Sequence, residues 1–157
     1  MKSIILIFSL LVCISCKNET PKTFINSNVV QDYSKLFSEK EVEKLSKKII
    51  DFEKRSTNQI CVYTKDSIPK NETILYHATN LATHLGVGTK EKNNGLLILI
   101  SRYDRQIAIA TGTGTEKVIT DAIAKRIIDK TILPKFKNNL YFEGITIGLD
   151  SLIKKWN

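Results

Sequence analysis

Two glycines and the acidic residue that follows them carry the first chemistry that this sequence suggests. Gly112 and Gly114 lie two residues apart in TGTGTE, and Glu116 follows two residues after Gly114. A dinucleotide-binding loop needs a third glycine where Lys117 stands, and the P-loop pattern GxxxxGK[ST] is absent from the chain. A carboxylate beside the glycines would also repel a phosphate from the loop amides. The motif therefore argues against a nucleotide site.

The oxygen-bearing side chains around this loop favour a hard cation instead. Calcium takes about six to eight oxygen ligands, and carboxylates, threonine hydroxyls and backbone carbonyls supply them. We therefore predict a divalent-cation site, with calcium as the ion, built from Asp32, Asp104, Glu116 and Asp121. The simpler alternative is that the two glycines turn the chain and that Asp121 caps a helix.

The other reactive side chains give no catalytic assignment. His77 and His84 lie on one expected helix about 10 Å apart along its axis, too far for one ion, so we expect surface histidines. Cys61 lies in the strand-like run QICVYT and is expected to be a small buried hydrophobic residue. The chain contains no HExxH, GxSxG or zinc-spaced cysteine motif, so the catalytic residues stay unknown.

The first residues predict export and a lipid anchor. Lys2 is followed by the apolar run IILIFSLLV and by CISC, in which Ser15 precedes Cys16. This is similar to a bacterial lipobox, although Cys13 stands where leucine is usual. We expect a signal peptide over residues 1–15, a lipidated Cys16 with a tether over 16–28, and a folded domain over 29–157. The protein would then be a membrane-anchored lipoprotein of the bacterial cell envelope, on its periplasmic or surface side.

Composition and charge fit a folded domain and do not indicate nucleic-acid binding. Hydrophobic residues make up 42% of the chain and charged residues 25%, with a net charge of +8. The basic residues are scattered and concentrate on one expected helix, over residues 40–55, as a solvated face. No nucleic-acid-binding motif occurs, and the envelope is not a suitable compartment for one. After loss of the signal peptide and lipidation of Cys16, Cys61 has no disulfide partner, and we expect a monomer.

Periodicity predicts alternating helices and strands that would position these residues. Ser38 and Glu41 form a capping box that opens an amphipathic helix, and Asn71 is expected to cap a second helix that Gly86 ends. Strands are predicted over 59–64, 96–100 and 106–111, the last two joined as an antiparallel hairpin. Further helices are predicted from 122 to Pro134 and over 141–156. This order predicts a three-layer α/β/α sandwich around a small mixed sheet.

An ordered set of segments resembles the TPM domain. These segments are VVQDYSKLFS, NNGLLILI, the Asp104-Arg105 pair, TGTGTE, TDA, RII, PKF and YFEGITIGL, and together they span roughly residues 29–155. The resemblance implies an α/β/α sandwich with a cleft where the loops meet, and calcium binding near that cleft. By position it implicates Asn94, Arg105, Gly112 and Gly114 in the cleft beside the four carboxylates, and it leaves Arg126 as a further cleft residue or a partner of a carboxylate.

The family includes envelope proteins of bacteria and thylakoid-lumen proteins of photosystem II repair, to which an acid phosphatase activity has been assigned. Two departures matter here. Thr113 and Thr115 stand where members often have an aromatic and an aliphatic residue, so an aromatic cleft wall is not expected. The C-terminal membrane span and glycine-rich tail of many bacterial relatives do not follow Asn157, and we expect the lipid anchor to replace them.

Two classes of function stay open at this point. One is a calcium-dependent phosphohydrolase, in which the metal and Arg105 would hold the phosphate and a carboxylate would orient water. The other is a non-catalytic envelope module that binds calcium and assists a partner complex. The sequence offers oxygen ligands but no clear nucleophile, which favours the second class.

Overall fold

The fold is built on one four-stranded sheet. A computed structural model describes residues 28–156. The strands β1 (Val30–Asp32), β2 (Gln59–Lys65), β3 (Gly95–Ser101) and β4 (Gln106–Thr111) lie side by side in chain order. The first three run parallel, and β3 and β4 form the predicted antiparallel hairpin. Only β1 was not predicted as a strand, because three residues are too few to show a period.

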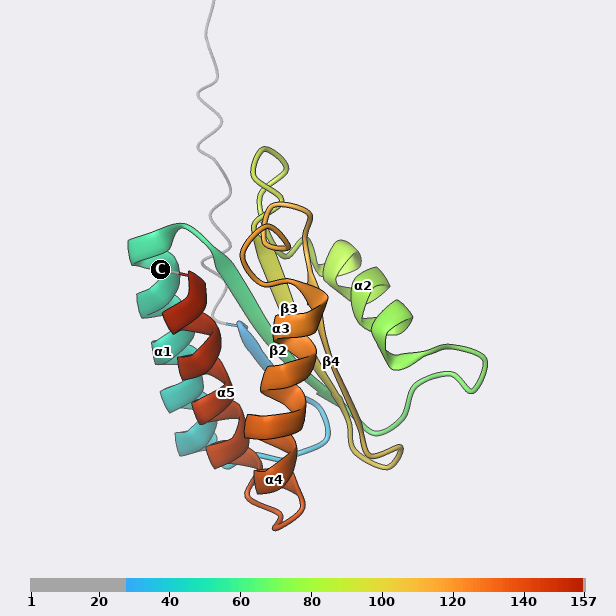
Figure 1. Ribbon diagram of the computed structural model, residues 1–157. Helices are drawn as coiled ribbons and strands as arrows, with labels where there is room; N and C mark the ends of the chain where they lie inside the picture. Colours follow the sequence, from blue (N-terminus) through green and yellow to red (C-terminus); the bar gives the residue numbers. More distant parts are fainter. Residues whose placement is uncertain (1–27, 157) are drawn as a thin grey trace, which may run out of the picture.

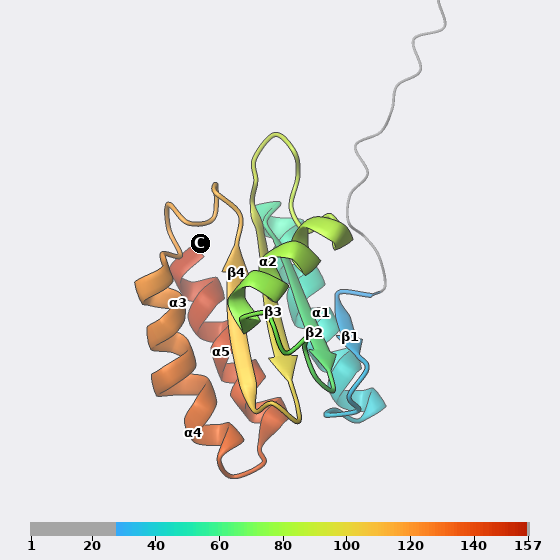
Figure 2. The same ribbon diagram turned by 90° about the vertical axis from the view of Figure 1, so that its right-hand side faces the viewer.

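Helices cover both faces of this sheet, as Figures 1 and 2 show. On one face lie α1 (Glu39–Ser56), α3 (Asp121–Ile127) and α5 (Tyr141–Trp156), and on the other lies α2 (Ile74–Leu85). The predicted three-layer α/β/α sandwich with a mixed sheet is therefore confirmed.

Strand alternation divides the core into two halves. In β3, Ile98 and Ile100 point toward α1, α3 and α5, whereas Leu97 and Leu99 point toward α2. Every residue of this strand is buried, as expected for a strand with helices on both faces. Cys61 lies with Leu97 and Leu99 in the half beneath α2, which confirms that it is a buried hydrophobic residue.

Local capping explains most helix ends and corrects one of them. The capping box of Ser38 and Glu41 is present at the start of α1, and Gly86 ends α2 in the left-handed conformation with φ +68°. The cap of α2 is Thr73 and not Asn71, because the Thr73 hydroxyl accepts the Tyr76 amide at 3.2 Å. Helix prediction by composition cannot separate two capping residues of similar propensity that lie two positions apart.

Pro134 does not end the third helical segment as predicted. After α3 the chain continues through a π-helical segment η1 (Ile128–Ile132) into α4 (Leu133–Phe136). Pro134 follows the π-helical segment, in which the Leu133 amide donates to the Ile128 carbonyl five residues back, so the hydrogen-bond pattern is already shifted where the proline N–H is missing. The extra π turn therefore lets the helical path pass the proline.

The predicted signal peptide, Cys16 and nearly all of the tether fall on residues 1–27, outside the described residues. Within residues 28–156, no helix combines the length and the apolar character that a membrane span requires.

Candidate functional site

Strand direction gives the sheet two distinct edges, and the predicted site residues divide between them. Because β1, β2 and β3 are parallel, the segments that follow them meet at one end of the sheet, here called the carboxyl edge. β4 returns antiparallel, so the glycine loop after it meets the start of β3 at the opposite end, here called the amino edge. The six residues of β4 separate the two edges by about 17 Å.

At the amino edge, the glycine loop packs tightly against the segment that precedes β3. A β-carbon at Gly112 would lie 2.3 Å from the Asn93 carbonyl oxygen, and one at Gly114 would lie 1.9 Å from the Lys92 carbonyl oxygen. The amides of Gly112, Gly114 and Glu116 donate to the carbonyls of Gly95, Asn93 and Gly112. These glycines are needed for close backbone approach, and their amides are already bound within the protein.

Asn94 has a structural role at the same edge. Its side-chain oxygen accepts the Thr89 amide at 3.0 Å, and its side-chain nitrogen donates to the Thr57 carbonyl at 2.7 Å. The side chain is 5% exposed and joins the loop before β3 to the turn between α1 and β2. Its hydrogen-bonding groups are therefore engaged inside the fold.

Glu116, Asp121 and Arg126 are exposed. Asp121 is the first residue of α3, but the cap is Thr120, whose hydroxyl accepts the Ile123 amide. The simpler alternative, in which Asp121 itself caps this helix, is therefore wrong by one residue.

The other two predicted metal ligands lie at the carboxyl edge and hold loops in place. Asp32 accepts the amides of Leu36 at 3.0 Å and Phe37 at 2.8 Å and the Thr64 hydroxyl at 2.5 Å, which closes the turn between β1 and α1. Asp104 accepts the Ser101 hydroxyl at 2.5 Å and the Ile68 amide at 2.8 Å.

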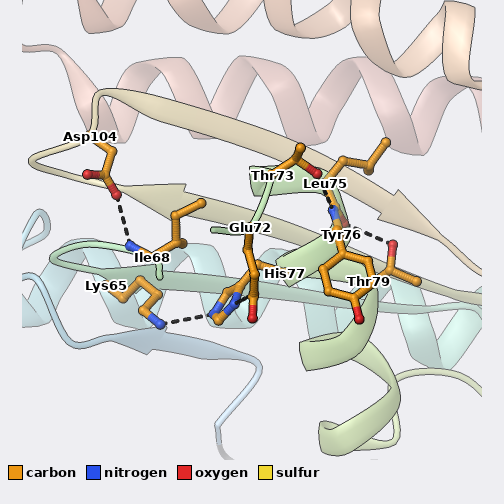
Figure 3. A network of polar contacts seen from close by, with 9 residues as sticks. All are labelled: Lys65, Ile68, Glu72, Thr73, Leu75, Tyr76, His77, Thr79 and Asp104. Carbon is orange, nitrogen blue, oxygen red and sulfur yellow. Dashed lines mark hydrogen bonds and ion pairs between the residues drawn. The ribbon is translucent and has the colours of Figure 1, made fainter. Parts of the chain in front are cut away.

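Asp104 thereby ties the β3–β4 turn to the loop after β2 (Figure 3). The hydrogen bond from Ser101, followed by that from Ile68, holds the pKa of Asp104 below its usual value. Asp104 is thus favoured in its charged form while it performs a structural task.

The four carboxylates predicted to share one calcium ion do not converge. Asp104 and Glu116 lie at opposite edges of the sheet, and in residues 28–156 no three or more His, Cys, Asp or Glu side chains gather as a metal site would need. The residues present do not fit a single calcium site made of Asp32, Asp104, Glu116 and Asp121. Calcium binding through other oxygens of the chain stays a prediction.

A cleft of about 340 Å³ opens at the carboxyl edge, beside the predicted residue Arg105. Its basic side chains are Arg102, Arg105 and Lys137. Its apolar wall consists of Ile100, Ile107, Leu133 and Phe136, and Ser101, Gln106, Asn139 and Tyr141 complete the lining. None of these residues is acidic, so the cleft suits an anion better than a cation. Sequence reasoning missed Lys137, Asn139 and Tyr141, whose place depends on the unpredicted path through η1 and α4.

Several exposed apolar side chains lie in segments at the same edge of the sheet as this cleft, although none of them lines it. Of the seven large hydrophobic residues exposed in the described chain, five lie in segments at the carboxyl edge: Tyr33, Leu75, Tyr76, Tyr103 and Leu140. The Arg102 guanidinium donates to the Ser34 carbonyl at 2.9 Å, so the turns that carry Tyr33 and Tyr103 are joined. We call these five residues and the cleft the carboxyl-edge surface.

A chain of polar contacts fastens α2 beside this surface, and Figure 3 shows it. His77 Nδ1 lies 2.5 Å from a Glu72 carboxylate oxygen, and His77 Nε2 lies 2.9 Å from Lys65 Nζ. The pattern fits a neutral imidazole that donates to Glu72 and accepts from the Lys65 ammonium. His77 is therefore a half-buried structural residue and not the predicted surface histidine, whereas His84 is exposed.

Cys61 offers no nucleophile to either edge. Its side chain is fully buried, and this burial raises the pKa of the thiol to about 12. The reactive thiolate is therefore scarce at neutral pH.

Comparison with known proteins agrees with the fold and the segment order described above. The family model of the TPM domain matches residues 30–155, nearly the whole described chain. The chain belongs to the TPM domain family. No curated protein sequence matches it significantly.

Solved structures of similar fold come from several bacteria. The N-terminal domain of a protein from P. gingivalis is 26% identical with a TM-score of 0.74, over 82% of this chain and 81% of that one. The BA42 protein from Bizionia argentinensis is 19% identical with a TM-score of 0.65, over 76% and 81%. The N-terminal domain of the cg2496 protein from Corynebacterium glutamicum is 17% identical with a TM-score of 0.66, over 88% and 85%. At these last two identities the likeness concerns the fold alone.

Proposed function

We propose that this TPM domain is an envelope-anchored module that binds a partner through its carboxyl-edge surface and catalyses no reaction. The observation that carries the proposal is that Tyr33, Tyr76 and Tyr103 are exposed in segments at the same edge of the sheet as a basic cleft. Tyrosine and arginine are enriched in protein interfaces and at the residues that dominate their binding energy. In parallel sheets, ligands also bind outside the carboxyl ends of the strands.

The position of the N-terminal segment supports this assignment. The chain enters β1 at Val30 from the amino edge, because β1 runs toward the carboxyl edge. In the proposal, Cys16 carries the lipid, and its tether would join the folded domain at the amino edge. This attachment would leave the carboxyl-edge surface free to bind another component of the envelope.

The lining of the cleft favours binding over phosphoester hydrolysis. Hydrolysis needs a nucleophile or a general base beside the substrate, and the lining contains no Asp, Glu, His or Cys. Ser101 does line the cleft. However, it follows Leu97 and Leu99 in the strand alternation, so its hydroxyl lies on the α2 side, where it binds Asp104. Arg102, Arg105 and Lys137 can hold an anion without activating water.

Photo-crosslinking in intact cells tests the proposal. A photoreactive residue in place of Tyr103, which is 68% exposed, should give a discrete crosslinked product. The matched control is Ile147, which is 39% exposed on α5, and the same residue placed there should give none. Equal products from both positions, or none from Tyr103, would contradict a binding role for this surface. Turnover of a generic phosphoester that disappears in an Arg105→Gln variant would instead support the phosphohydrolase.

A further inference from the structure

We infer that the carboxyl-edge cleft binds an anionic group carried on an apolar body about the size of one aromatic side chain. This inference deepens the proposed function, because it names the chemistry that would anchor a partner there. Binding of a small ligand by the cleft does not itself require that partner.

The cleft holds three positive side chains, and none of them lies within ion-pair distance of a carboxylate in the described residues, although Arg105 also borders a second groove that Asp121 and Asp129 line. None of the ion pairs found in residues 28–156 includes Arg102, Arg105 or Lys137. Arg102 uses one guanidinium nitrogen to donate to Ser34 and keeps its other donors. Guanidinium groups form strong, charge-assisted hydrogen bonds with anions, so an anionic group on the ligand would replace the missing counter-charge.

Two residues of the lining are held in the left-handed backbone conformation. Arg105 has φ +53° and Asn139 has φ +57°, and neither is a glycine. The Arg105 amide donates to the Arg102 carbonyl at 3.3 Å, and the Asn139 amide donates to the Phe136 carbonyl at 3.0 Å. Such conformations are costly for most residues, less so for asparagine, and they also occur at Lys35, Thr57 and Asn93, outside the cleft. Here both occur in turns that place polar side chains at one cleft.

The apolar wall of the cleft indicates a ligand that has an apolar part as well as a charge. Ile100, Ile107 and Leu133 line the cleft together with Phe136, whose ring lies 4.9 Å from that of Tyr141. The volume of about 340 Å³ is near the lower end of small-ligand pockets, which begin at about 300 Å³. A ring or short alkyl body with one anionic group fits within this space and can cover the apolar wall, whereas inorganic phosphate would leave that wall uncovered.

Two sources share this chemistry. One is a free aromatic carboxylic acid, and the other is a partner protein that ends in an apolar residue with a free terminal carboxylate. We commit to the anion on an apolar body, and the ligands in the experiment distinguish its sources.

The experiment is a binding titration of the isotope-labelled full chain in lipid nanodiscs, followed by amide chemical shifts. The probes are 3-phenylpropionate, its neutral amide, inorganic phosphate, and the peptides Gly-Gly-Phe and Gly-Gly-Phe-amide. The first probe should shift the amides of residues 100–107 and 136–141. Its affinity should exceed that of its neutral amide and of phosphate by about tenfold or more.

Variants then assign the contacts. Arg105→Gln and, independently, Lys137→Gln should each weaken binding of 3-phenylpropionate about tenfold, whereas Lys117→Gln at the amino edge should leave it unchanged. If Gly-Gly-Phe binds more tightly than 3-phenylpropionate, the natural ligand is the carboxyl terminus of a protein. If 3-phenylpropionate binds more tightly, the natural ligand is a small molecule. The inference would be overturned if the neutral amide or inorganic phosphate bound as tightly as 3-phenylpropionate. It would also be overturned if the chemical-shift changes lay outside residues 100–107 and 136–141. Ligand binding here without crosslinks from Tyr103 would reject only the proposed partner.

Discussion

Replacing Gly114 with alanine should destabilise the fold although this residue lies in a surface loop. The added β-carbon would lie 1.9 Å from the Lys92 carbonyl oxygen and 3.0 Å from that of Asn93. Both neighbours are backbone atoms at the entrance to β3, so the loop as a whole must move. The Gly114 amide also donates to the Asn93 carbonyl at 3.0 Å, and that bond would be lost.

The expected cost follows from these two effects. Overpacking against a fixed neighbour costs about 1–3 kcal/mol, and a lost backbone hydrogen bond costs about 1 kcal/mol. The sum, roughly 3 kcal/mol, is a large share of the stability of about 5–15 kcal/mol that domains have. For a domain of this size it lowers Tm by about 10–15 °C.

Gly86→Ala is the matched control, measured by thermal and urea unfolding beside Gly114→Ala. Gly86 has φ +68°, but a β-carbon there would meet nothing within 4 Å, so only the left-handed conformation costs energy. That cost is about 1 kcal/mol, or about 3–5 °C. If Gly114→Ala were no less stable than Gly86→Ala, the glycine loop would not be held by close packing.

Three further predictions follow from the site residues. Because the pKa of Asp104 is lowered, its contribution to stability is full above about pH 4 and is lost as the pH falls through the lowered value. The Asp104→Asn variant should therefore be less stable than the wild type at pH 7, and its free energy of unfolding should fall less as the pH is lowered. Urea unfolding at several pH values measures both proteins, and an equal fall in the two would contradict this prediction. Cys61, with a pKa of about 12, should resist iodoacetamide at pH 8 in the native protein and react in urea, as peptide mass spectrometry would show. If calcium raises Tm, Glu116→Gln and Asp104→Asn should not both abolish that rise, because the two side chains lie at opposite edges and cannot bind the same ion. Calcium titrations of Tm on the two variants measure this.

Most elements of the fold could be predicted from the sequence because their periods are long and clear. The run Leu96–Ile100 identified the central strand, and the short connection to Gln106 identified the hairpin. β1 and η1 could not be found in this way, since three strand residues show no alternation and a π turn depends on packing with neighbouring helices. Thr73 displaced Asn71 as a cap because both residue types suit that position.

The arrangement of the site could be predicted only in part, because it depends on which sheet edge each loop occupies. Acidic residues near one another in the chain, such as Asp104 and Glu116, are separated by the length of β4. Asp32 and Asn94 are polar residues of the expected kinds, yet their atoms hold loops together. Arg105 was predicted as a cleft residue and lies beside Lys137, a neighbour that only the tertiary fold supplies.

The central claim is that the carboxyl-edge surface is covered by a partner in the envelope. The most direct test is hydroxyl-radical footprinting, in which the rates of side-chain modification are compared between native membranes and the purified protein. Tyr33 and Tyr103 are 65% and 68% exposed, and both should be modified more slowly in native membranes. Val118 at the amino edge, 43% exposed, and Ile147 on α5 should react at the same rate in both samples. Unchanged modification of both tyrosines, or protection confined to Val118 and Ile147, would contradict the claim.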